Sequence, residues 1–82
     1  MEIKILGTGC AKCHQLEQTV KEVIAELGVD TNVDYVKDIK KIMEYPILTT
    51  PGLVIDGKVV SSGRVPNKTE ITSFIITALG KE

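Results

Sequence analysis

The chain has 82 residues, of which 43% are hydrophobic and 26% charged. This is the composition of a globular protein, and its length supports one small domain over residues 1–82. Ten basic and eleven acidic residues leave a net charge of -1, which excludes the strong general attraction to nucleic acid that a clustered basic surface provides. No apolar run reaches the roughly 18 residues of a membrane span, so we expect no membrane partner either.

The cysteine content is informative because the chain has only 2 cysteines. That number is too small for a secreted disulfide scaffold of this length. The first residues also lack the basic stretch and apolar run of a secretory signal. We therefore expect a reducing, cytoplasmic setting, where a close cysteine pair is more often redox-active or metal-binding than structural.

The first two predicted elements are a strand and a long helix. Polar and apolar residues alternate over residues 2–6, which predicts a strand, and Gly7 and Gly9 interrupt it. Apolar residues then recur at helical spacing over residues 13–27. Gly28 is a natural end for this helix.

A second strand and a short helix follow. Residues 31–36 alternate again, and Tyr35, like Tyr45 further on, is expected to be a half-buried packing residue. Asp38 can cap a short helix that carries apolar residues on one side. These apolar residues are Ile39, Ile42 and Met43.

The second half of the chain predicts a hairpin. Asp56-Gly57 lies between two β-rich runs, at residues 53–55 and 58–60, and this dipeptide is among the strongest hairpin signals.

The last predicted element is a helix. Asn67 followed by Glu70 resembles a capping box, and helical spacing of apolar residues over 71–79 predicts the helix itself. The order is strand, helix, strand, helix, strand, strand, helix. The long first helix favours a parallel crossover between the first two strands. The sequence thus predicts an α/β fold with a mixed four-stranded sheet and three helices.

The motif Cys10-Ala11-Lys12-Cys13 stands where the first strand gives way to the first helix. Unsatisfied N–H groups and a partial positive charge at a helix N-terminus favour a thiolate at Cys10. Lys12 is a further candidate for tuning the acidity of the thiols. Cys13 lies on the apolar stripe of the helix and is expected to face inward. We expect Cys10 to be the exposed nucleophile and Cys13 the shielded, resolving thiol.

Other chemistries use the same residues. A soft-metal carrier of the copper type is the main alternative, because thiolates select such metals. A closed zinc site is not expected, since zinc requires four ligands and Cys10, Cys13 and the adjacent His14 cannot surround it. His14 is expected to lie in solvent on the helix face. A dinucleotide site is excluded because Lys12 occupies the place of the third fingerprint glycine.

The sequence resembles the thioredoxin/glutaredoxin-like superfamily, and within it the small thioredoxin-like family called redox-active disulfide protein 2. Three segments carry the resemblance across most of the chain. They are Gly7-Thr8-Gly9-Cys10-Ala11-Lys12-Cys13 after the first strand, Thr50-Pro51 before the third strand, and Gly63 after the hairpin.

The resemblance implies a thioredoxin-like fold and a thiol–disulfide oxidoreductase that needs no cofactor beyond the Cys10–Cys13 pair. It implies that Pro51 is a cis-proline beside the disulfide, and that Thr50 offers its backbone to a bound peptide. With Gly9 and Gly63, these residues form the expected substrate-binding set. The expected partners are a disulfide-bearing protein or small molecule and a reductant of unknown identity, and the chain is expected to act as a monomer.

Overall fold

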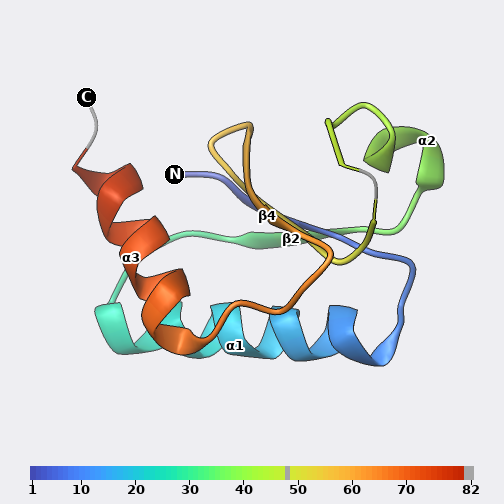
Figure 1. The fold of residues 1–82 in the computed structure, drawn as a ribbon. Coiled ribbons are helices and arrows are strands. Elements are labelled where there is room, and N and C mark those ends of the chain that lie inside the picture. Colours follow the sequence, from blue (N-terminus) through green and yellow to red (C-terminus); the bar gives the residue numbers. More distant parts are fainter. Residues whose placement is uncertain (48, 81–82) are drawn as a thin grey trace.

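The computed structural model describes residues 1–47 and 49–80 (Figure 1). The predicted order of strands and helices is confirmed. The elements are β1 (Ile3–Leu6), α1 (Ala11–Leu27), β2 (Val33–Val36), α2 (Ile39–Ile42), β3 (Gly52–Ile55), β4 (Lys58–Ser62) and α3 (Lys68–Leu79). Together they form an α/β fold with a mixed four-stranded sheet.

The strands lie in the order β2-β1-β3-β4, so β1 is an inner strand. β1 pairs in parallel with β2, as the long crossover helix predicts, and antiparallel with β3. In this register Ile5 lies opposite both Tyr35 and Leu53. The segment that carries the cysteines therefore leaves the sheet from a strand that is held on both sides.

The two faces of the sheet bury unequal cores. Because side chains alternate along a strand, Ile3 and Ile5 of β1 pack with α1 and α3 in the larger cluster. Leu6 packs on the opposite face with Ile42 of α2 and Val54 of β3. Figure 1 shows the same division, with α1 and α3 on one side of the sheet and α2 on the other.

α1 begins and ends where its sequence predicts. Cys10 is the N-cap residue, and Gly28 ends the helix in the left-handed conformation, with φ 68°. The predicted apolar face packs into the larger core, except that Leu27 in the last turn stays 38% exposed. None of the helices within the described residues is both long and apolar enough to cross a membrane.

α2 buries less of its apolar side than the sequence predicts. Asp38 caps the helix as expected, since its carboxylate accepts a hydrogen bond from the Lys40 amide at 2.9 Å. Only Ile42 is buried, while Ile39 is 60% and Met43 75% exposed. A helix of 4 residues is little more than one turn, so it can present only a narrow face to the sheet.

Candidate functional site

The cysteine pair lies at the junction between β1 and α1. Cys10 has an extended backbone, and its Sγ accepts a hydrogen bond from the Cys13 amide at 3.3 Å. The Cys10 thiol therefore serves as the cap of the helix, because it satisfies one of the amides that a helix N-terminus leaves free. Both cysteines are free thiols.

The two thiols differ in burial, as the sequence predicts. Cys10 is exposed, whereas Cys13 is 0% exposed and faces the sheet from the first turn of α1. A partner can reach the first sulfur directly. The Cys13 sulfur can react only with a group that is already held at the Cys10 sulfur.

The environment of Cys13 favours its ionisation. Burial raises the pKa of this thiol, but Cys10, the nearby Tyr35 hydroxyl and the Gly9 backbone favour the charged form, outweigh burial and hold the pKa below its ordinary value. The sequence assigns the activating effect of the helix terminus to Cys10, whereas the lowered pKa in the structure is that of the buried Cys13.

Tyr35 is the residue of the site that sequence reasoning missed, since the sequence predicts only a packing role for it. The Tyr35 hydroxyl is buried beside Cys13 and Gly7. Burial and the interaction with Cys13 raise the pKa of Tyr35 to about 12. The sequence signal was a half-buried tyrosine in an alternating strand, but its position relative to the cysteines depends on the register between β1 and β2.

Three of the expected substrate-binding residues, Thr50, Pro51 and Gly63, meet at the start of β3. The Thr50–Pro51 peptide bond is cis, and Pro51 is buried. The Pro51 carbonyl accepts a hydrogen bond from the Gly63 amide at 2.9 Å, which joins two of the predicted residues. Gly63 itself has a φ of 77°, a conformation that favours glycine.

Thr50 is brought to the cysteine loop from a distant part of the sequence. It lines a hollow of 490 Å³ together with Thr8, which stands two residues before Cys10. Exposed Ile39 of α2 and Met43, the C-cap residue of this helix, line the same hollow. An apolar surface thus borders the loop that leads to Cys10.

The remaining predicted site residues lie around the start of α1. Gly9 is exposed and has a φ of 97°, so it turns the chain into Cys10. Lys12 is exposed in the first turn of the helix. His14 is also exposed, but its ring stacks on Tyr35 with 5.9 Å between the ring centroids.

Comparison with known proteins agrees with this geometry. A family model described as a thioredoxin domain matches residues 1–76. The chain belongs to this thioredoxin family. A thioredoxin of Methanothermobacter thermautotrophicus is 40% identical over 75 residues, which is 92% of this chain and 97% of that protein. A thioredoxin of Methanocaldococcus jannaschii is 41% identical over 69 residues, or 84% of this chain and 79% of that protein.

Membership of the thioredoxin family identifies the chemistry of the cysteine pair. The chain is a thiol–disulfide oxidoreductase with a thioredoxin-like fold. Members of this family act on proteins that carry disulfides. The family model and both relatives are thioredoxins, so the soft-metal alternative gains no support from these comparisons.

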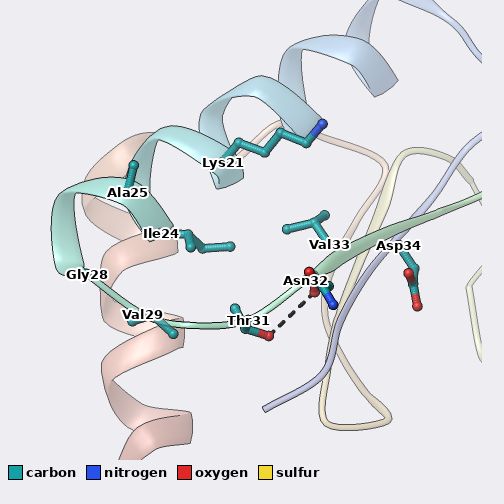
Figure 2. Close-up of a pocket in the computed structure, with 9 residues that line it drawn as sticks. All are labelled: Lys21, Ile24, Ala25, Gly28, Val29, Thr31, Asn32, Val33 and Asp34. Atoms are coloured by element: carbon teal, nitrogen blue, oxygen red, sulfur yellow. Dashed lines mark hydrogen bonds between the residues drawn. The ribbon is translucent and has the colours of Figure 1, made fainter.

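A separate hollow of 610 Å³ lies away from the thioredoxin motif. Figure 2 shows that Lys21 and Ile24 of α1 line it from one side and Val33 of β2 from another. The lining residues of α1 lie more than two helical turns beyond Cys13. Exchange between the sulfurs therefore takes place outside this hollow.

Proposed function

We propose that Cys10 is the attacking thiol of this oxidoreductase and that Cys13 is the resolving thiol. The observation that carries the assignment is the difference in burial, since Cys10 is exposed and Cys13 is 0% exposed. Attack on a protein disulfide requires a thiolate that its partner can approach. Resolution requires that the second thiol lie adjacent to the first and lose its proton.

The exchange balances without any further cofactor. The Cys10 thiolate attacks one sulfur of the substrate disulfide, and the other substrate sulfur leaves as a thiolate. Cys13 gives its proton to solvent or to the substrate thiolate released in the first step and attacks the Cys10 sulfur. The Cys10–Cys13 disulfide forms and the bound substrate sulfur leaves. Two electrons pass from the cysteine pair to the substrate, and the steps run in reverse when the pair oxidises a dithiol.

We propose further that a substrate polypeptide lies across Thr50 and Pro51, flanked by Gly9 and Gly63. The hollow shared by Thr50 and the cysteine loop supports this arrangement. It has room for an apolar side chain next to the substrate disulfide, which favours disulfide-bearing polypeptides over small disulfides. Lys12, exposed in the first turn of α1, contributes a positive charge near the attacking sulfur.

The setting of the reaction is also part of the proposal. We propose that the chain acts as a monomer in a reducing cytoplasm, with a cellular thiol or dithiol as the source of electrons. The low cysteine content supports this setting.

Trapping distinguishes the roles of the two cysteines. The Cys13→Ser and Cys10→Ser variants are each mixed with a peptide that contains one disulfide, and covalent adducts are measured by intact mass. We expect Cys13→Ser to accumulate the mixed disulfide, because its attacking thiol is intact and nothing resolves the adduct. The matched control, Cys10→Ser, should give little adduct, because its remaining thiol is buried. Accumulation with Cys10→Ser alone would reverse the assignment.

A further inference from the structure

The Tyr35 hydroxyl is a buried polar group without a hydrogen-bond partner among the described residues. Its ring is half-buried, stacks on His14, and lies 5.5 Å from the Lys37 ammonium. Buried hydroxyls are normally paired, and each exception in a folded protein requires an explanation. The neighbourhood of Cys13 supplies one.

Gly7 shows how closely this hydroxyl approaches the sulfur. A Cβ placed on Gly7 would lie 2.5 Å from Cys13 Sγ and 3.1 Å from Tyr35 Oη. The sulfur and the hydroxyl therefore border the same small space, which a glycine leaves open.

The protonation state of Cys13 decides whether the hydroxyl has a partner. A neutral thiol is a weak hydrogen-bond acceptor. A thiolate carries a full negative charge, and hydrogen bonds to charged acceptors are shorter and about twice as strong as neutral ones. The structure describes the free thiols, so the hydroxyl is unpaired in the state where its neighbour accepts poorly.

We propose that Tyr35 donates a hydrogen bond to the Cys13 thiolate and thereby promotes resolution of the mixed disulfide. This inference rests on the proposed role of Cys13 as the resolving thiol. The O–H bond of Tyr35 stays intact throughout. Cys13 loses its own proton to solvent or to the substrate thiolate released in the first step, then attacks the Cys10 sulfur, and the hydroxyl stabilises the negative charge until the new bond forms.

Tyr35 acts as a donor and not as a base. Burial, followed by the interaction with Cys13, raises the pKa of Tyr35 to about 12. The phenol therefore keeps its proton across the neutral range and offers a permanent donor. The thiol of Cys13 ionises first, because its neighbours hold its pKa below the ordinary value despite burial.

The titratable groups around Tyr35 come from two elements. Cys10, Cys13 and His14 face it from the start of α1, and Lys37 faces it from the end of β2. The Tyr35→Phe variant retains the ring and hence its contacts with His14 and Lys37. The difference between tyrosine and phenylalanine isolates the hydroxyl.

The test measures the pKa of Cys13 in a Cys10→Ser background, where it is the only cysteine. Isotope-labelled Cys13 is followed by NMR of its β-carbon as pH is varied. We expect Tyr35→Phe to raise the pKa of Cys13 by about one unit, which is roughly a tenfold loss of thiolate below that pKa. The matched control is Tyr45→Phe, since Tyr45 packs in the smaller cluster on the other face of the sheet. It should leave the pKa of Cys13 unchanged.

The rate of resolution gives a second measurement with both cysteines present. A mixed disulfide on Cys10 is formed rapidly, and release of the bound peptide is followed against pH. Tyr35→Phe should move the pH profile of release to higher pH by the same amount. A fluorinated tyrosine at position 35 has a more acidic hydroxyl and should move the pH profile of release to lower pH. This variant keeps the test decisive if the phenylalanine variant folds poorly.

The outcomes separate this inference from the proposed function. An unchanged pKa of Cys13 in Tyr35→Phe, with Cys13→Ser still trapping the peptide, would overturn the role of Tyr35 alone. Failure of Cys13→Ser to trap the peptide would overturn the assignment of the resolving thiol itself.

Discussion

Gly7 is the residue on which the packing of the site depends most directly. It is buried, and a Cβ at this position would lie 2.9 Å from Cys13 Cβ as well as 2.5 Å from its sulfur. We expect Gly7→Ala to destabilise the fold by about 1–3 kcal/mol, the usual range for overpacking a core. It should also slow resolution by displacing Cys13. Urea denaturation and the release assay measure the two effects.

A glycine elsewhere provides the control for Gly7. Gly80 has a φ of -81°, and an added Cβ there would meet Ile76 O at an ordinary 3.5 Å. Gly80→Ala should leave stability unchanged or raise it by up to about 1 kcal/mol. Equal losses of stability in Gly7→Ala and Gly80→Ala would show that the effect at Gly7 does not come from close contact with Cys13.

The sequence identifies some residues of the site and not others. Cys10 and Cys13 could be found because they are close in the chain and occupy a recognisable junction of strand and helix. Tyr35 could not, because its proximity to Cys13 arises from the pairing of β1 with β2. The local sequence around a single tyrosine does not reveal how its strand pairs with a strand that is distant in the chain.

The start of α3 depends on an interlocked cap. Asn67 and Glu70 form the predicted capping box, and Glu70 also receives two hydrogen bonds from Arg64, at 2.7 and 3.2 Å. Arg64, and then the Asn67 amide, hold the pKa of Glu70 below its ordinary value of 4.5. Because the pKa of Glu70 is lower in the folded protein than in the unfolded chain, Glu70 stabilises the fold at pH values above its unfolded pKa. This stabilisation is lost as the pH falls through the folded pKa.

The lowered pKa of Glu70 predicts how the stability of the fold depends on pH. Above the ordinary glutamate range, Glu70→Gln should be less stable than the original chain, because the amide lacks the charge that Arg64 pairs with. The gap between the two should narrow as pH falls below 4.5, because the native carboxylate becomes protonated. Urea denaturation at a series of pH values measures the gap. Parallel stability curves throughout this range would show that Glu70 gains nothing from its ion pair.

The elements differ in how well the sequence predicts them. The hairpin is predicted by two adjacent residues, and Asp56 and Gly57 do take positive φ values of 52° and 80°. The exposure of Ile39 and Met43 is not predicted, because helical spacing says which residues share a face but not whether anything covers it. In this fold a helix of one turn anchors through Ile42, and the rest of its apolar side borders the hollow beside Thr50.

At the scale of the molecule, the sheet divides the core unevenly. The cluster beneath α1 and α3 contains most of the fully buried side chains, while the cluster beneath α2 contains Leu6, Ile42 and Val54. We expect the amides of α2 to exchange with solvent through local opening and those of β1 and β3 only through global unfolding. Native-state hydrogen exchange in low denaturant measures this difference. Protection of α2 equal to that of β1 would contradict it.

The unequal ends of α1 have a consequence for how this protein can diverge. One end carries the reacting sulfurs, and the other borders the hollow of Figure 2, about 25 Å away along a helix of 17 residues. Substitutions at the distant end do not alter the spacing of the sulfurs, the cap or the tyrosine beside them. Selection can therefore change that surface while the redox chemistry stays the same. Proteins descended from one such chain can thus acquire different binding partners and still catalyse the same reaction.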